Sequence, residues 1–499
     1  MMSLYEKLDI PLIIQTFDIS KYFDSEVLKD AMASLYEAGV KGKLYRLWFE
    51  LNKETEIRVR TGVGTTQKAV VGETVAQGSI GGGLLSSLNL DVEVTHFFEG
   101  SMEEAGYSDI RFQPMILQDD LSRLCTSAES ARTGCRRIEI VMKLKQLSLN
   151  VKKSSYIVCQ NSSKSQEIKD DLLRNPILYN KIPIKEKLSE KYLGDMISGG
   201  GLAASVDSTI SERYGRIFNA ILEVKVILED YRSSTAGGIR AGIMLWEMAI
   251  IPSLLNNSET WISISEESIK KLENLQNMMI RFFFNTATST PKAALLWDTG
   301  ILPIEQQIEQ KKLTFLHHLM TLPADSLANQ VYVEQKVNQF PGLVTECQDI
   351  MQKYDLPDIT EQTIPSKLSW KNEVKSKISD HIETKLKAEI GKMTKLENID
   401  AQNETFSAKS YLSELNLTQA RTKFKLRSRM LEVKNNFKGG RTAVNLMCDS
   451  CESSLETQDH LLFCPAYRDL RMDMDLGSDM DLVNYVRQVL VRREDTKKK

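Results

Sequence analysis

The sequence predicts an α+β fold followed by a helical region. Strand-like and helix-like patterns alternate through the first 200 residues, and beyond residue 205 only the helical spacing of Leu, Ile and Met remains. The 499 residues are 42% hydrophobic and 26% charged, which is typical of globular domains and excludes collagen-like and disordered chains. The net charge of −3 gives no overall positive field, so a nucleic-acid partner would need local basic surfaces.

Five segments of the first 200 residues carry patterns of regular structure. They are strands at 12–17, 56–60, 110–118 and 155–159, and a helix over 28–36. Asp24 and Ser25 have the side chains that commonly cap a helix N-terminus, and Gly39 is suited to its C-terminal end. We therefore expect a central sheet with helices packed beside it.

The rest of the chain is predicted to be helical up to a polar tail that frays. Helical periodicity runs through 208–230, 238–256, 265–284 and 303–322, and a charged, helix-prone stretch follows to residue 420. These changes of pattern divide the chain into five parts, 1–204, 205–322, 323–440, 441–475 and 476–499.

Neither a membrane span nor a signal peptide is predicted. No stretch reaches 18 apolar residues, and Glu6, Lys7 and Asp9 interrupt the N-terminal region. Seven cysteines, an odd number in a long chain, favour a reducing compartment over a disulfide framework. The sequence therefore predicts a soluble intracellular protein of the nucleus or the cytoplasm.

Carboxylates stand at the ends of two predicted strands. Asp18 follows the strand at 12–17, and the adjacent pair Asp119 and Asp120 follows the strand at 110–118. Like charges this close repel each other, and a solvated turn or a divalent cation makes them tolerable. If the strands are neighbours, Asp18 and Asp119 could hold two Mg²⁺ ions for phosphoryl transfer. An Asp–Asp turn without chemistry is the alternative.

The order of these blocks resembles the palm of reverse transcriptases from non-LTR (LINE-like) retrotransposons. Five blocks carry the resemblance, namely 17–24 (motif A), 77–88 (motif B, rich in glycine), 117–120 (motif C), 149–154 (motif D) and 192–194 (motif E). It implies a polymerase palm, an antiparallel sheet with flanking helices, followed by an all-helical thumb. The Gly-rich block taken alone is a weak signal, because a flexible hinge explains it better.

The resemblance also implies roles for individual residues. Asp18 and Asp119 would be ligands of two Mg²⁺ ions, with the Ile19 carbonyl assisting and Asp120 beside them. The residues implied to contact nucleotide or template are Phe23, Gln77, Gly78 and Lys153. A core aromatic remains the alternative for Phe23, and a solvated surface lysine for Lys153.

Three positions depart from the family's pattern. Motif C has Leu117 where an aromatic residue is usual and Gln118 where a small residue is common, and motif B has Gly83 where proline is usual. None of the three removes an implied metal ligand.

A cysteine and histidine cluster near the C-terminus predicts a zinc site. Cys448, Cys451, His460 and Cys464 follow the spacing C-x₂-C-x₈-H-x₃-C, which supplies four ligands for tetrahedral Zn²⁺. Because all four ligands come from the protein, the site is expected to be structural. This knuckle also resembles the C-terminal zinc segment of the same retrotransposon proteins.

Basic residues precede the cluster. Segment 420–441 carries eight Lys or Arg residues against the single Glu432, a local charge of +7 with Phe424 and Phe437 interleaved. Such a stretch favours RNA binding through phosphate contacts and stacking, and a solvated helix face is the alternative. The candidate RNA-binding residues are Arg421, Lys423, Lys425, Arg427 and Arg429.

The function predicted from these features is an RNA-directed DNA polymerase that joins a dNTP to a primer 3′-OH on an RNA template. A catalytically inactive RNA-binding remnant is the alternative, and an RNA polymerase or intron maturase is a weaker third possibility. In the family a fingers subdomain precedes motif A, whereas 17 residues precede Asp18 here. We therefore expect an N-terminally truncated palm that extends a primer weakly on its own, while RNA binding through 420–471 persists.

Overall fold

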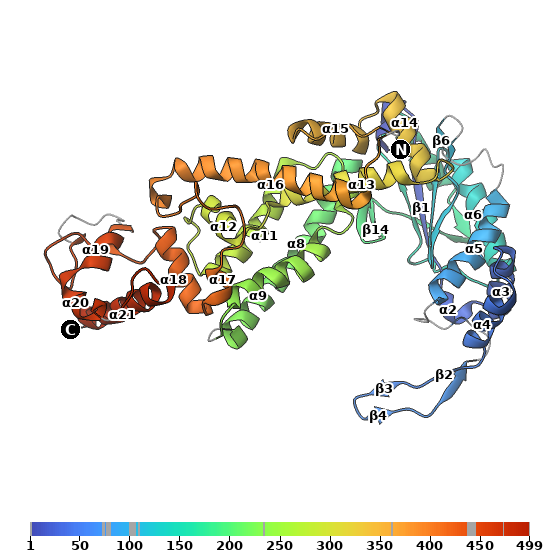
Figure 1. Cartoon of the computed structure of the whole chain (residues 1–499). Coiled ribbons are helices and arrows are strands. Elements are labelled where there is room, and N and C mark those ends of the chain that lie inside the picture. Colours follow the sequence, from blue (N-terminus) through green and yellow to red (C-terminus); the bar gives the residue numbers. More distant parts are fainter. Residues whose placement is uncertain are drawn as a thin grey trace. The chain divides into compact units, whose positions relative to one another are not determined.

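The computed structural model of the chain forms two compact units (Figure 1). It describes residues 2–71, 75, 81–98, 106–107, 110–232, 235–360, 363–436, 446–472 and 474–498. Residues 1–209 and 322–345 form the first, called here the α+β unit, and residues 210–321 and 346–499 form the second, the helical unit. A mixed α+β part followed by a helical part confirms the predicted fold class. Among the described helices, none is long and apolar enough to cross a membrane.

Five strands form the central sheet of the α+β unit, in the order β13-β10-β1-β9-β8. Their bounds are β1 Ile13–Asp18, β8 Met115–Leu117, β9 Asp120–Cys125, β10 Ser155–Val158 and β13 Lys185–Glu186. All neighbours are antiparallel except β10 and β13, which run parallel. The central position of β1 follows from its sequence, since an apolar run suits a strand that is paired at both edges.

Different segments cover the two faces of this sheet. Successive side chains of a strand point to opposite faces, so Ile13 and Phe17 of β1 pack into the cluster with α5 (Gly82–Phe98) and α6 (Ala128–Leu144). Ile14 points to the other face, where it packs with Phe340 from the returning segment 322–345. The same alternation places Asp18 on the face opposite α5 and α6.

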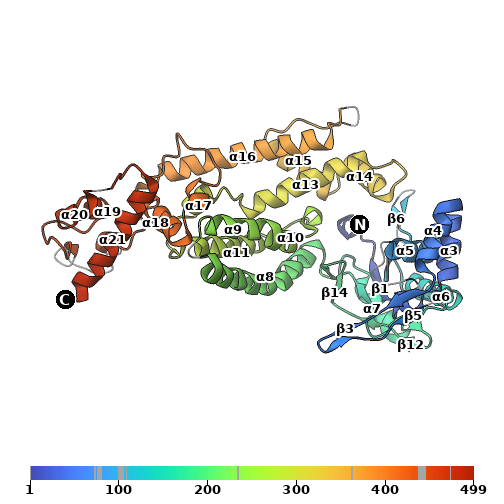
Figure 2. The ribbon, with the colours of Figure 1, turned by 60° about the horizontal axis from the view of Figure 1, so that its bottom comes forward.

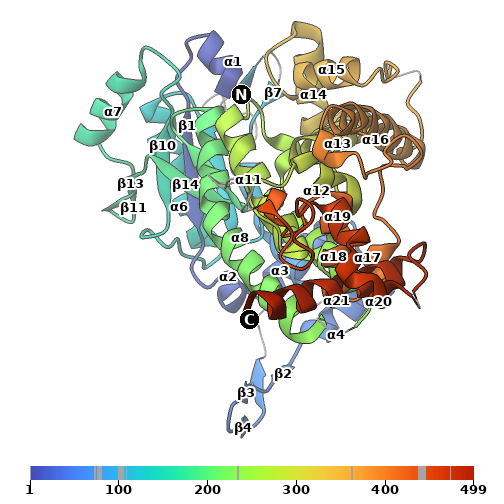
Figure 3. The same cartoon turned by 90° about the vertical axis from the view of Figure 1, so that its left-hand side faces the viewer.

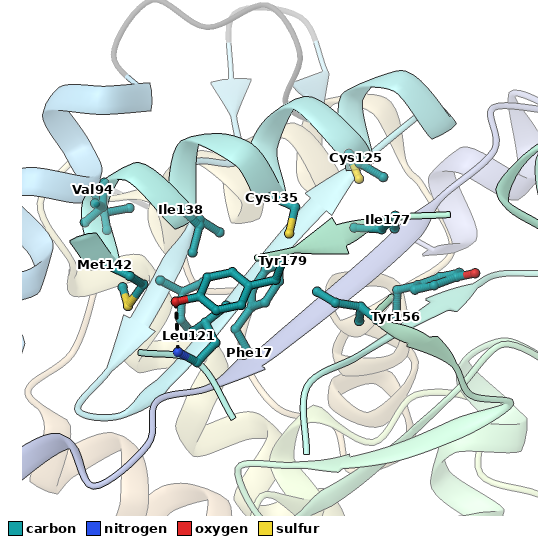
Figure 4. Packing of buried hydrophobic residues seen from close by; sticks show 14 of the residues in the cluster. Phe17, Val94, Leu121, Cys125, Cys135, Ile138, Met142, Tyr156, Ile177 and Tyr179 are labelled. Carbon is teal, nitrogen blue, oxygen red and sulfur yellow. Dashed lines mark hydrogen bonds between the residues drawn. The ribbon is translucent and has the colours of Figure 1, made fainter. Parts of the chain in front are cut away.

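The larger cluster is the core that fixes the sheet against its helices. Figure 4 shows Ile138 and Met142 of α6, together with Val94 of α5, lying over Phe17 and Leu121 of the two central strands. All five side chains are at most 2% exposed. This packing holds β1 and β9 in one register, and that register positions the carboxylates at their ends.

Shorter elements complete the α+β unit. The helices are α1 Met2–Lys7, α2 Tyr22–Ser25, α3 Leu28–Glu37, α4 Gly42–Asn52, α7 Ser165–Arg174 and α14 Leu327–Asn338. The strands outside the central sheet form the pairs β2 Thr55–Ile57 with β5 Ala69–Val71, β3 Arg60–Thr61 with β4 Gly64–Thr65, β6 Gly106–Tyr107 with β7 Ile110–Arg111, β11 Leu178–Tyr179 with β12 Ile182–Pro183, and β14 Ser189–Tyr192 with β15 Asp195–Ser198.

Two predictions for this unit need correction. The buried strand expected over 110–118 is two short strands, β7 and β8, separated around Pro114, which lacks the N–H that a ladder requires. β8 is an edge strand, so Met115 and Leu117 are 37% and 52% exposed. The helix over 28–36 begins at Leu28 after an N-cap at Val27, not at Asp24 and Ser25.

The helical unit contains the helices predicted from periodicity (Figure 2). Their bounds are α8 Leu202–Arg232, which begins in the α+β unit, α9 Gly238–Leu245, α10 Ile251–Leu254, α11 Glu266–Phe284, α12 Lys292–Thr299, α13 Ile304–Thr321, α15 Leu343–Lys353, α16 Lys367–Gly391, α17 Tyr411–Glu414, α18 Leu417–Arg427, α19 Gln458–Phe463, α20 Arg468–Arg471 and α21 Asp479–Lys498. A π-helical turn, Trp246–Ile250, joins α9 to α10 just before Pro252. Proline has no backbone N–H to donate, which favours such a local change of helical pairing.

The prediction of a frayed polar tail is wrong. α21 packs against α18, and both lie beside α20 in Figure 3. Its apolar residues Val483, Val486 and Val489 are fully buried. The repeated Asp residues masked this pattern in the sequence, because they precede and begin the helix, where negative charge is favourable.

A buried ion cluster joins α18 to α12 within the helical unit. The Arg427 guanidinium lies 3.0 Å from Asp298, which is 0% exposed, and 2.7 Å from Glu404. Tyr411 donates a hydrogen bond of 2.7 Å to Asp298 as well. Burial alone would raise the pKa of Glu404, but the hydrogen bonds and charge of Arg427 lower this pKa to about 2. The cluster is stable because each buried charge has a partner.

We predict that Arg427→Ala destabilises the protein by about 3–5 kcal/mol, because it leaves Asp298 buried without its cation. Denaturant unfolding followed by circular dichroism measures the change. Arg492→Ala is the matched control, since Arg492 pairs with Asp469 at an exposed site, and its loss should destabilise the protein far less. Equal effects of the two substitutions would contradict the assignment.

Candidate functional site

The register of the central sheet brings two of the predicted carboxylates to one place. β1 and β9 are antiparallel, and Asp18 is the direct partner of Asp120 at their ends. Asp119 and Gln118 form the two-residue turn between β8 and β9, where Gln118 adopts the left-handed conformation with φ 56°. The adjacent carboxylates that the sequence placed after one strand therefore belong to a hairpin, with Asp120 opening its second strand.

A turn over residues 149–154 fixes the backbone of Asp18 from the other side. The Asp18 N–H donates to the Ser154 hydroxyl at 3.2 Å, and its carbonyl accepts from the Asn150 N–H at 2.8 Å. This contact brings the Lys153 ammonium to 3.5 Å from the Asp18 carboxylate. The turn over residues 149–154 thus lies beside the end of β1, and Lys153 forms an ion pair with Asp18 there.

Repulsion among the carboxylates contributes to the pKa of Asp120. Burial raises the pKa of Asp120, the charges of Asp119 and Asp18 raise it further, and Lys153 lowers it. Asp119 also contributes to the raised pKa of Tyr22, whose main cause is burial. These three carboxylates consequently act on one another electrostatically, and an added positive charge would relieve the strain.

A cleft of about 240 Å³ opens beside Asp18 and Asp120. The residues that line it are Thr16, Phe17, Asp18, Asp120, Lys152, Lys153, Lys187, Glu190, Lys191 and Tyr192. Tyr192 comes from the β14–β15 hairpin, whose turn is Leu193 and Gly194. Sequence reasoning missed Lys187 and Lys191, although the alternation of Lys and Glu over 185–191 marks a strand with a basic face.

The glycine-rich block allows α5 to approach this hairpin closely. A Cβ on Gly83 would lie 2.7 Å from the side-chain amide nitrogen of Gln118, and the Gln118 N–H donates to the Ser87 hydroxyl at 3.3 Å. A helix turn without a side chain at Gly83 therefore supports the turn that carries Asp119. Gln77 and Gly78 lie outside the described residues.

Two other residues implied by the resemblance, Phe23 and Ile19, lie near the carboxylates. Phe23 is half-buried in α2, with its ring centroid 5.9 Å from that of Tyr22, and it does not line the cleft described above. Ile19 continues β1 with an isolated bridge to Leu149, and its side chain is 2% exposed.

A buried polar network lies next to the segment that follows Asp18, and the sequence analysis did not predict it. Glu26 is 0% exposed and accepts hydrogen bonds from the Ser86 hydroxyl and, at 3.0 Å, from Asn89. Lys145 donates to Asn89 at 3.0 Å. Burial raises the pKa of Glu26. The network ties α5 to the segment that follows Asp18, so it helps to hold the carboxylates in place.

The predicted zinc ligands come together as expected from their spacing. One ligand atom from each of Cys448, Cys451, His460 and Cys464 lies within 4.8 Å of the other three, so the group could hold zinc. The Cys451 sulfur lies 3.3 Å from His460 Nε2. Cys448 and Cys464 are fully buried, which suits a closed structural site.

The cluster is part of the helical unit and not an isolated knuckle. Arg471 donates to the Cys464 carbonyl at 3.0 Å and to the Tyr485 hydroxyl of α21 at 2.8 Å. Gln458, beside the ligand loop, donates to the Leu426 carbonyl of α18 at 2.8 Å. The four ligands are therefore braced by α18 and α21.

Within the described part of segment 420–441, the five candidate cations do not form the exposed basic surface expected from the sequence. Each of the five candidate cations pairs with a carboxylate, and their side chains are only 13–28% exposed. The pairs are Arg421 with Glu229, Lys423 with Asp479, Lys425 with Glu432, Arg427 with Asp298 and Glu404, and Arg429 with Glu397 and Asp459. Counting charge along the sequence failed because most of these carboxylates come from distant segments. Phe437 lies outside the described residues.

No protein-family model matches the chain, and no curated protein matches it. Among solved structures it is similar to apo telomerase from Candida tropicalis (TM-score 0.29, 10% identity, 56% of this chain and 48% of that chain). It is also similar to telomerase in complex with a TWJ fragment of telomeric RNA from Candida albicans (0.28, 12%, 63% and 51%) and from Candida tropicalis (0.30, 11%, 75% and 51%). The chain spans about half the length of each telomerase chain that it matches.

Asp120→Asn is expected to stabilise the α+β unit at neutral pH. The pKa of Asp120 in the folded protein lies above the ordinary 3.8, so the protonated carboxyl group stabilises the fold at low pH. This stabilisation is lost as the pH rises through the pKa of the folded protein. The gain in melting temperature should therefore be larger at pH 7 than below pH 3.8. Asp9→Asn is the control with the opposite sign, because hydrogen bonds from Ser163 lower the pKa of Asp9. A gain independent of pH would refute the electrostatic cause.

Purified protein is expected to contain close to one zinc per chain, measured by plasma mass spectrometry. Cys451→Ser should release the metal and loosen the fold around 446–472, because metal binding and local folding are coupled. Cys347→Ser, a buried cysteine of the same unit outside the cluster, should keep its zinc. Protein prepared without chelator that holds no zinc would rule out the site.

Proposed function

We propose that the chain is an RNA-directed DNA polymerase of the non-LTR retrotransposon type. The observation that carries the proposal is the register of β1 and β9, which sets Asp18 opposite Asp120 with Asp119 in the adjoining turn. Asp18, Asp119 and Asp120 are the residues that the resemblance identified as catalytic. Antiparallel strand ends carrying these carboxylates are the arrangement that the polymerase hypothesis requires.

The donor set at this edge fits divalent cations. Carboxylate oxygens are the ligands that Mg²⁺ prefers. Burial is the main cause of the raised pKa of Asp120, and the charges of Asp119 and Asp18, which a cation would offset, raise this pKa further. In the proposal Asp18, the Ile19 carbonyl and Asp119 hold two Mg²⁺ ions, with Asp120 beside them. When bound, the ions supply charge neutralisation for phosphoryl transfer.

The chain's own residues would orient the reactants around this edge. Lys153 and the cleft lysines Lys152, Lys187 and Lys191 offer cations to the phosphates of a dNTP or of the primer. Phe23, Gln77 and Gly78 remain the proposed contacts to nucleotide and template. An RNA template and a DNA primer are the proposed partners, since several lysines line the cleft that contains Asp18.

The proposed zinc site would act as a structural support in this protein. Its four ligands are held between α18 and α21, so zinc would stabilise the end of the helical unit. The same intramolecular pairing weakens the case for RNA binding by Arg421 to Arg429. The alternative of an inactive RNA-binding remnant drew on the helical thumb, the basic arm and the zinc knuckle together. It therefore loses part of its support, and the polymerase is the better supported function.

Single-nucleotide incorporation with Mg²⁺, an RNA template and a DNA primer tests the proposal. Asp119→Ala and Asp18→Asn are expected to lower the incorporation rate by about 10²–10³-fold or more, because each removes charge stabilisation at the reacting phosphate. Leu173→Ala, an exposed position on α7, is the control that should keep the rate.

A second readout does not require activity. Mg²⁺ should raise the melting temperature of the wild-type protein, and Asp18→Asn should reduce this shift, because the cation relieves repulsion among the carboxylates. Incorporation and Mg²⁺ stabilisation that are both unaffected by Asp18→Asn would refute the proposal. Stabilisation without incorporation would favour the inactive remnant.

A further inference from the structure

The outward face of α4 carries a row of exposed leucines. Leu44, Leu47 and Leu51 are 52%, 54% and 66% exposed. Their spacing of three and four residues places them on one side of the helix, over about two turns. Among the residues of α4 only Asn52 is buried. α4 lies beside α3 at an edge of the α+β unit (Figure 1), and the exposure of the three leucines leaves their row accessible to another molecule.

The opposite face of α4 is already packed. Tyr45, Trp48 and Phe49 lie against a cluster of α3 and α5 residues. Gly81 approaches the Trp48 ring so closely that a Cβ there would overlap the ring atoms. The helix is therefore anchored, and it cannot rotate to bury the leucines within its own unit. A contiguous apolar row on an anchored helix is typical of an interaction site.

Two charged residues beside the row indicate which partner fits. Lys43 and Glu50 flank the same edge of the leucine row and, like Leu44 and Leu51, are seven residues apart. Both are exposed, and no ion pair joins either of them to another residue in the described part of the chain. A row with one cation and one anion at matching distances from its centre is complementary to its own antiparallel copy.

The geometry of a two-fold axis makes this complementarity explicit. In a symmetric pair residue i contacts residue j of the other copy, and j contacts i. With Leu47 on the axis of two antiparallel helices, Leu44 meets Leu51 of the partner subunit, and Lys43 meets Glu50 of the partner subunit. Each copy would thereby bury its leucine row and form two interchain ion pairs. A membrane surface fits less well, because anionic lipid headgroups would repel the Glu50 carboxylate beside the apolar row.

We propose that α4 is a dimer interface, in which two copies of this chain pair antiparallel through Leu44, Leu47 and Leu51. The interface is separate from the carboxylate cleft and from the cysteine cluster. Its small apolar area predicts a weak, concentration-dependent dimer in place of a permanent one.

Sedimentation equilibrium of the full chain across a range of concentrations tests the proposal. Leu47→Glu should raise the dimer dissociation constant by about 30-fold or more, since it removes the central contact and sets two like charges face to face. Leu173→Glu is the matched control, because Leu173 is a lone leucine of α7 that is 84% exposed. Circular dichroism checks that both variants stay folded.

A charge exchange tests the antiparallel register. Lys43→Glu and Glu50→Lys should each weaken the dimer, and the double exchange should restore it, because only then does every charge again meet its opposite. A wild-type chain that stays monomeric would overturn the proposal, as would dimers unaffected by Leu47→Glu or a double exchange without restoration. Binding of the monomer to lipid vesicles through Leu47 would equally overturn it in favour of a membrane.

Discussion

The antiparallel pairing of β1 with β9 is the constraint on which the candidate site depends. It sets Asp18 directly opposite Asp120, and a slip of one residue would turn either carboxylate to the face that α5 and α6 cover. The buried contacts of Phe17 and Leu121 oppose such a slip, because both side chains would leave the core. The same strand register therefore determines both the apolar core and the positions of the carboxylates.

Charge is handled differently in the two units. Around Asp18 and Asp120 like charges gather, which is costly for folding and suits the binding of cations. In the helical unit opposite charges are matched, and Arg427 between Asp298 and Glu404 is the fullest case. The first arrangement is typical of a functional site, and the second is typical of a structural one.

The sequence was sufficient where the determinants are local. Periodicity predicted β1, α3 and most helices of the helical unit, and ligand spacing predicted the group around Cys448, because neighbouring residues create both patterns. The sequence was insufficient where interacting residues are far apart in the chain. Arg421 forms an ion pair with Glu229, and Glu26 accepts a hydrogen bond from Ser86. The burial of α21 was hidden for the same reason, since only contacts with α18 explain it. For the carboxylates, the sequence argument required the strand at 110–118 to be the neighbour of β1, whereas that neighbour is β9, which begins at Asp120. The hairpin at Asp119 became clear only from strand pairing.

The return of residues 322–345 to the α+β unit has a consequence for how the chain is synthesised. Phe340 completes the cluster around Tyr5 and Ile14, yet it follows all the helices between 210 and 321 in the chain. On a ribosome the sheet therefore emerges with one apolar face partly bare, while helices of another unit are produced. Chaperones would have their longest opportunity to bind during this interval, and a fragment that ends at residue 209 would remain in that state permanently.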